Sequence, residues 1–97
     1  MIKSHILITP KALDPEAVTT QVKGSANGGV VTFLGTTRDE TEGRQVFHLE
    51  YEAYEAMAEK TIRQILNEVR ERWGVTDAAV AHRVGRVDIG QVSMVVA

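Results

Sequence analysis

The stretch GGVVTFLGTTRDETEGRQVFHLEYEAY, residues 28–54, contains a strand, a charged loop and a second strand, and the rest of the chain is arranged around it. The nearly continuous apolar run from Val30 to Leu34 is typical of a strand that is covered on both faces. Beyond the loop, residues 47–53 alternate between apolar and polar side chains, which predicts a strand with one exposed face. The two strands present the loop between them, so functional residues are expected there.

The composition describes one small globular domain. The chain has 97 residues, of which 43% are hydrophobic and 25% charged. A net charge of −2 argues against nucleic-acid binding through bulk electrostatics. There is no cysteine, which excludes disulfides, thiolate metal ligands and cysteine nucleophiles within this chain. No stretch approaches the ~20 apolar residues of a membrane helix, and the N-terminus lacks a signal-peptide pattern, so we expect a soluble cytoplasmic protein without membrane contacts.

The N-terminal third predicts a strand and a helix. Residues 4–9 are a β-branched run that ends at Pro10, as in a strand near the edge of a sheet. Asp14 has the position of an N-cap before Pro15, and the helix is expected to run to about Lys23. The glycine-rich residues 24–29 lack the Lys-Ser/Thr ending of a phosphate loop and precede a strand, so they predict a flexible connection.

The second half predicts a long helix and two strands. Helical spacing indicates a helix from about Glu55 to Trp73 that Gly74 terminates, with a buried stripe made of Ala58, Ile62, Ile65, Val69 and Trp73. Strands are expected at residues 78–84 and 92–97, with a chain reversal over residues 85–90 between them. The chain ends inside the apolar run 95–97, and we expect this end to be a truncation, because such a strand normally leads on to another element.

This order, β-α-β-β-α-β-β, predicts an α+β fold with an antiparallel-rich sheet. The second strand is expected to pair with the third, and the fourth with the fifth. Both helices are expected on one face of the sheet, and the long helix makes a crossover connection plausible.

Five basic residues are candidates for an anion pocket, because guanidinium groups bind phosphate or carboxylate in a bidentate manner. Two flank the central loop and three lie near the end of the fourth strand: Arg38, Arg44, His82, Arg83 and Arg86. The pocket requires these two regions to be adjacent. The alternative is that all five are solvated surface charges.

Two further patterns carry less functional information. His48, Glu50 and Glu52 lie at i, i+2 and i+4 of one strand face, as in a metal site or an acid–base pair. Any half-exposed strand shows the same pattern, so no metal site is predicted. Gly43, after Glu42, is expected to supply the positive φ that the turn needs. No arrangement of Ser, His and Asp that would form a catalytic triad can be argued from the sequence.

Three separated segments carry a family resemblance: residues 28–65, RWGV at 72–75, and AHRVGRVDIG at 81–90. They occur in the same order in the large (catalytic) subunit of molybdopterin synthase, the MoaE family, which this chain resembles from Gly28 to its end. The resemblance implies an α/β hammerhead, an α+β architecture that dimerises.

The resemblance also implies a reaction and its partners. Members of this family insert two sulfurs into cyclic pyranopterin monophosphate (precursor Z) and so form the dithiolene of molybdopterin for molybdenum cofactor biosynthesis. The sulfur arrives as a thiocarboxylate on the C-terminal Gly-Gly of a small ubiquitin-like subunit, and two large and two small subunits form a heterotetramer. A chain without cysteine suits this sulfurtransferase scheme, in which the protein needs no cofactor of its own.

The family's site residues carry over in part. Thr36, Thr37 and Arg38 correspond to a substrate-binding segment in which the arginine is most important, and Thr36 often corresponds to a lysine in relatives. His82, Arg83 and Gly85 match a strand-and-turn signature that we interpret as structural. The family's catalytic lysines and a second His-Arg pair lie beyond Ala97, so the catalytic residues of this chain are unknown. The alternative is therefore a non-catalytic partner-binding module of the same fold.

Overall fold

The computed structural model describes residues 3–41, 44–45, 48–51 and 55–97, without the side chains of Lys3 and of residues 40–51. It contains two helices and a mixed four-stranded sheet, which confirms the predicted α+β class. Two short strand pairs accompany the main sheet. In chain order the elements are β1 (Lys3–Thr9), α1 (Pro15–Val22), β2 (Phe33–Thr36), β3 (Glu40–Thr41), β4 (Arg44–Gln45), β5 (His48–Tyr51), α2 (Glu55–Trp73), β6 (Asp77–Arg83), β7 (Gly85–Asp88) and β8 (Val92–Val96).

The main sheet has the strand order β1-β6-β8-β2, with β1 at one edge as predicted. β1 runs parallel to β6, with Ile6 opposite Val80, while β8 is antiparallel to both β6 and β2. The predicted pairing of the fourth and fifth strands is confirmed as β6 with β8. The predicted pairing of the second strand with the third is wrong, because β2 pairs with β8 and β5 pairs with β7.

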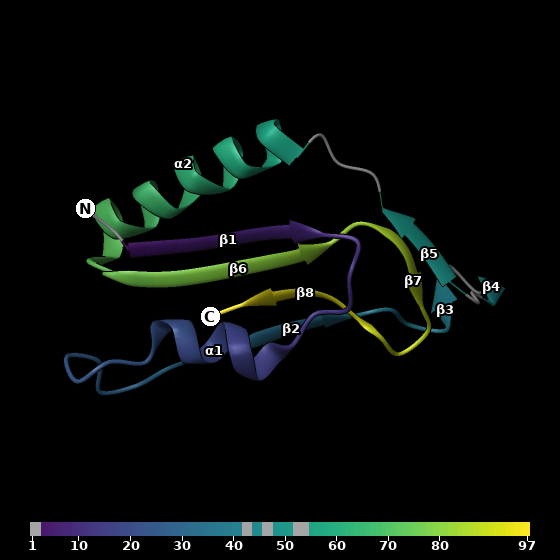
Figure 1. Cartoon of the computed structure of the whole chain (residues 1–97), viewed down its shortest axis with the longest axis horizontal. Coiled ribbons are helices and arrows are strands. Elements are labelled where there is room, and N and C mark those ends of the chain that lie inside the picture. Colours follow the sequence, from purple (N-terminus) through teal and green to yellow (C-terminus); the bar gives the residue numbers. More distant parts are fainter. Residues whose placement is uncertain (1–2, 42–43, 46–47, 52–54) are drawn as a thin grey trace.

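The two helices cover opposite faces of this sheet, so the expectation that they share one face is wrong (Figure 1). Val18 and Val22 of α1 pack with Ala79, Ala81 and Val95. Leu66 of α2 packs with the intervening residues of β6, Ala78 and Val80. Successive strand residues point to opposite faces, and all four residues from Ala78 to Ala81 are buried. β6 is therefore a strand that is covered on both sides.

β2 does not have this role, although its sequence suggested it. The strand begins only at Phe33, and it lies at an edge of the sheet. Val31, Phe33 and Leu34 are 84%, 59% and 45% exposed. Helix α1 packs on β6 and β8, and α2 packs on β1, so neither helix covers this edge. The prediction of a doubly covered strand at residues 28–34 is wrong for this reason.

The ends of the helices follow the predicted local signals. The Asp14 carboxylate accepts hydrogen bonds from the backbone N–H groups of Glu16 and Ala17 at 3.1 and 3.3 Å, which satisfies two free donors of α1. Helix α2 ends at Gly74, whose φ of 70° is left-handed and whose N–H donates to the Arg70 carbonyl at 2.8 Å. Both helices therefore have the extents that the sequence predicts.

The buried stripe of α2 differs from the prediction. Leu66 is its buried residue, and Ile62 is partly buried against the same cluster. Ile65 and Trp73 are 53% and 69% exposed, so their placement in the stripe is wrong. The apolar face of this helix is wider than the surface that β1 and β6 offer it, which leaves one side of the face in contact with solvent.

The small strands extend the molecule away from the main sheet. Figure 1 shows β5 and β7 beyond the end of the sheet at which β1 and β6 terminate. The radius of gyration is accordingly 14.6 Å, against about 13 Å for a compact chain of 100 residues. The predicted reversal at residues 85–90 contains β7, which makes that prediction wrong in part. Gly85 and Gly90, with φ of 78° and 79°, bend the chain at either side of β7.

Candidate functional site

Three chain segments meet at one end of the main sheet. β2 and β6 both run antiparallel to β8, so the last residues of β2 and β6 lie beside the first residues of β8. Figure 1 shows this end facing β5 and β7. Residues 36–38, 83–86 and 90–92 are therefore neighbours, and we call this region the junction. It contains the substrate-binding segment that the sequence predicts.

The backbone of Thr37 is held by the turn between β7 and β8. Its N–H donates to the Gln91 carbonyl at 3.1 Å, and its own carbonyl accepts from the Gly90 N–H at 2.7 Å. The register of β2 against β8 shifts between Gly35 and Thr36, as in a β-bulge. Bulges change the direction of side chains at the end of a strand. Thr37 is 2% exposed, whereas Thr36 and Arg38 on either side are exposed.

Arg38 has an exposed, positively charged side chain at the junction. Its side chain is exposed and makes no hydrogen bond or ion pair with the described side chains of residues 4–39 and 55–97. A guanidinium group in this state can offer a bidentate pair of donors to a phosphate or a carboxylate. The anchored Thr37 backbone restricts where that group can lie.

Three of the other predicted basic residues already have partners. Arg83 donates from Nη1 to the Gln91 side-chain Oε1 at 3.0 Å, and Arg86 donates from Nε to Asp88 at 2.8 Å. The His82 ring Nδ1 lies 2.9 Å from the Ser93 carbonyl. The structure thus brings the region of Arg38 next to that of Arg83, as an anion pocket requires, but His82 and Arg86 are engaged elsewhere. The side chain of Arg44 lies outside the described residues.

Two buried side-chain polar atoms of the described residues lack a hydrogen-bond partner, and both belong to the junction. They are Thr37 Oγ1 and Arg83 Nε. Leaving such a group unsatisfied costs about 1–3 kcal/mol, and native structures retain few of them. Gln91, which joins the two segments, was not identified from the sequence. A single glutamine after a turn glycine has no recognisable pattern.

The described part of the chain contains neither a candidate metal cluster nor a helix that could span a membrane. The described residues contain no cluster of three or more His, Cys, Asp or Glu side chains that could hold a metal ion. The side chains of His48 and Glu50 and the whole of Glu52 lie outside that part, so the possible metal pattern there stays untested. None of the described helices combines the length and the apolarity that a bilayer crossing requires.

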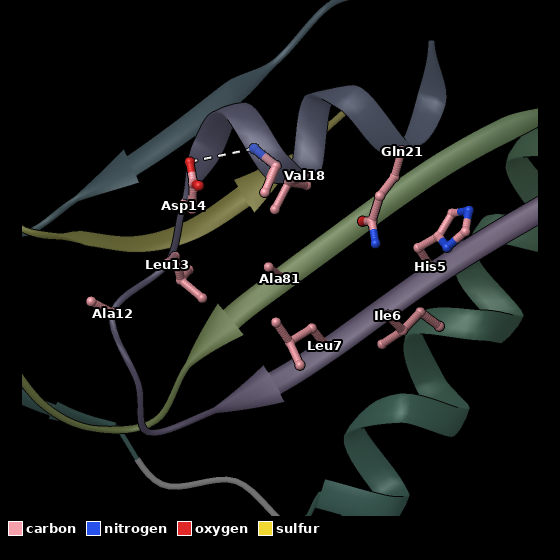
Figure 2. A pocket seen from close by; sticks show the side chains of 10 residues that line it. His5, Ile6, Leu7, Ala12, Leu13, Asp14, Val18, Gln21 and Ala81 are labelled. Atoms are coloured by element: carbon pink, nitrogen blue, oxygen red, sulfur yellow. Dashed lines mark hydrogen bonds between the residues drawn. The ribbon is translucent and has the colours of Figure 1, made fainter. Parts of the chain in front are cut away.

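A hollow of about 400 Å³ lies elsewhere, between α1, β1 and β6. Figure 2 shows Leu7 and His5 from β1 on one side, with Leu13, Val18 and Gln21 on the other. The Asp14 carboxylate at its rim already caps α1. The hollow shares no residue with the junction and contains no arginine or lysine, so it does not suit a phosphate-bearing ligand.

Comparison with known proteins gives consistent matches. Residues 8–97 match the family model described as MoaE protein. The molybdopterin synthase catalytic subunit of Bacillus subtilis (strain 168) is 40% identical over 90 residues, which are 93% of this chain and 57% of the relative. That of Rattus norvegicus is 44% identical over 95 residues, which are 98% of this chain and 48% of the relative.

Solved structures agree with these matches. The crystal structure of molybdopterin synthase from Staphylococcus aureus superposes with a TM-score of 0.84 at 34% sequence identity, covering 95% of this chain and 66% of that one. A MoaE protein from Burkholderia ambifaria MC40-6 gives a TM-score of 0.79 at 30% identity, covering 96% and 61%. The chain thus spans about half to two thirds of the length of these relatives.

Proposed function

Because the chain belongs to the MoaE family, we propose that it acts as the catalytic subunit of molybdopterin synthase, with the junction as part of its substrate site. The observation that carries this proposal is the family match over residues 8–97, which includes all three segments of the junction. The proposed substrate is cyclic pyranopterin monophosphate, and the proposed product is the dithiolene of molybdopterin.

The proposed sulfur donor is the thiocarboxylate at the C-terminus of a small ubiquitin-like subunit. In each transfer, sulfur forms a bond to a substrate carbon, and that carbon loses its bond to an oxygen of the substrate. Water then attacks the partner's terminal carbonyl carbon, the bond between that carbon and sulfur breaks, and the partner leaves as a carboxylate. The chain's part in this scheme is to bind the anionic substrate and to orient it toward the partner's C-terminus.

Arg38 is proposed to bind the substrate's anionic group, with Thr36 and Thr37 forming the rest of the segment. The exposed guanidinium of Arg38 supports this role, because it has no competing carboxylate among the described side chains. Thr37 contributes through its backbone, which the turn before β8 holds from both sides. Its buried hydroxyl is not placed to contact a ligand directly.

The apolar surface supports the proposed assembly, a homodimer that binds two small subunits. Among the large apolar residues of the described part, several on and before β2 and on α2 are strongly exposed: Val31, Phe33, Met57, Ile65 and Trp73. Exposed apolar patches of this kind mark surfaces that other proteins cover. The distribution over two elements is compatible with more than one interface.

The test is sulfur transfer by the full protein, with its thiocarboxylated partner and cyclic pyranopterin monophosphate. We expect Arg38→Ala to lower kcat/KM at least tenfold, roughly the loss of one charge-assisted hydrogen bond. Arg38→Lys keeps the charge without the planar fork and should give an intermediate value. Arg70→Ala, which removes an exposed guanidinium from α2, is the matched control and should leave the rate unchanged.

The outcomes separate the two functions that the sequence left open. An unchanged rate in Arg38→Ala removes this residue from the site. A wild-type protein that binds the ubiquitin-like partner but transfers no sulfur contradicts the proposal and favours the non-catalytic binding module.

A further inference from the structure

We propose that Gln91 and Arg83 are positioning residues that hold the Thr36–Arg38 segment in place for substrate binding. This inference rests on the function proposed above. Neither residue is placed in contact with substrate; both act through hydrogen bonds that end at Thr37. The proposal also gives Arg83 a role beyond that of a solvated charge.

The first step is the contact that the Gln91 side chain makes with its surroundings. Its Oε1 lies 3.0 Å from Arg83 Nη1, at the end of β6, and 3.4 Å from the backbone N–H of Asp88, at the end of β7. A carbonyl oxygen has two lone pairs and can accept from both donors at once. One atom of Gln91 therefore ties the turn before β8 to two other strands.

The second step leads from this turn to the substrate-binding segment. Gly90 and Gln91 form the two backbone hydrogen bonds with Thr37, at 2.7 and 3.1 Å. A shift of the turn relative to β6 must therefore shift Thr37 as well. Arg38 follows directly in sequence, and its backbone moves with that of Thr37. The position of the Arg38 guanidinium thus depends on a contact that Arg38 does not make.

The third step concerns the chemistry of Arg83. Its Nε is buried without a partner among the described residues, and Nη1 donates to Gln91. The Gln91 oxygen is therefore the hydrogen-bond acceptor that the described residues provide for this cation. Leucine at position 91 has a similar size but no hydrogen-bond acceptor. We expect the Arg83 side chain to change its conformation so that its guanidinium group can donate to water or to another oxygen. Glutamate keeps the acceptor and adds a charge.

Amide hydrogen exchange tests the structural part without any substrate. In Gln91→Leu, the amides of Thr37 and Gly90 should exchange roughly tenfold faster than in the wild type, because local opening becomes easier. The amides of Ala79 and Ala97, which bond across the main sheet at 2.9 Å, should keep their rates. Gln91→Glu should restore slow exchange, and Gln64→Leu on the exposed face of α2 is the matched control.

Sulfur transfer tests the functional part in the full protein. Gln91→Leu should raise KM for cyclic pyranopterin monophosphate about tenfold and leave kcat within about twofold, since Gln91 positions a binding group. In an Arg38→Ala background the same change should have little further effect, because both act through one group. A purely structural loss would instead add to the effect of Arg38→Ala.

Each result has a defined reading. If the amides of Thr37 and Gly90 exchange at the wild-type rate in Gln91→Leu, Gln91 does not hold this segment in place. An equal rise in the exchange rates of Ala79 and Ala97 leads to the same conclusion, because the loosening is then global. A KM that stays at the wild-type value in Gln91→Leu, or that rises by the same factor with and without Arg38, overturns the positioning role. A wild-type protein without sulfur transfer contradicts the proposed function. The exchange rates still decide separately whether Gln91 holds the Thr36–Arg38 segment in place.

Discussion

The packing of α1 on the sheet can be tested at Val95, a fully buried residue at the centre of that interface. Val95 is 0% exposed and belongs to a cluster with Val18, Val22, Ala79 and Ala81. Val95→Ala removes two carbons, worth about 0.8 kcal/mol each in lost transfer free energy. The cavity adds to this loss, since two neighbours, Ala79 and Ala81, have side chains that are too short to fill it. We expect a total loss of about 2–3 kcal/mol.

Urea unfolding followed by circular dichroism measures this loss as a lower midpoint with an unchanged slope. The melting temperature should fall by roughly 10–20 °C, since 1 kcal/mol corresponds to about 4–8 °C for a domain of this size. Val31→Ala is the matched control, because it removes the same two carbons from a residue that is 84% exposed. That variant should stay within about 0.5 kcal/mol of the wild type. If Val95→Ala were as mild as Val31→Ala, the packing of α1 on the sheet would be wrong.

Two further predictions concern the ends of the helices and use the same unfolding measurement. Asp14→Ala removes the acceptor for two N–H groups of α1 and should lower the free energy of unfolding by about 1 kcal/mol, whereas Asp14→Asn should retain most of it; equal losses would contradict the cap. Gly74→Ala forces a β-carbon into a left-handed conformation with φ of 70° and should lose about 1–2 kcal/mol. Gly28→Ala places its β-carbon in equally open space at a residue without a positive φ and should show no such loss.

The features that the sequence predicted correctly depend on neighbouring residues. The cap at Asp14, the long helix from Glu55 to Trp73 and its end at Gly74 all arise within one or two helical turns. The ion pair between Glu59 and Arg63, one turn apart at 3.0 Å, is likewise a local contact. Local hydrogen bonds and backbone preferences decide such features, so a short window of sequence contains the information.

The errors concern which strand lies at the centre. Val30 to Leu34 and Ala78 to Ala81 are both apolar runs, and the first is the more hydrophobic, yet the second is the one that both helices cover. The small side chains of the alanines allow close approach of a helix, and β6 pairs on both edges, with β1 and with β8. The hydrophobicity of a segment alone does not distinguish a strand buried in the core from an apolar strand exposed at the surface.

The same division holds for the site. By itself, the sequence determined the local elements and the family, and it predicted a substrate-binding segment from Thr36 to Arg38. Only the tertiary structure decided that Arg83 lies beside this segment, that Arg86 is occupied by Asp88, and that Gln91 connects the parts. The backbone hydrogen bonds of Thr37 reach Gly90 and Gln91, which lie 53 and 54 positions further along the chain. Strand order brings them together, and strand order results from the burial of both faces of β6, a property of the whole chain.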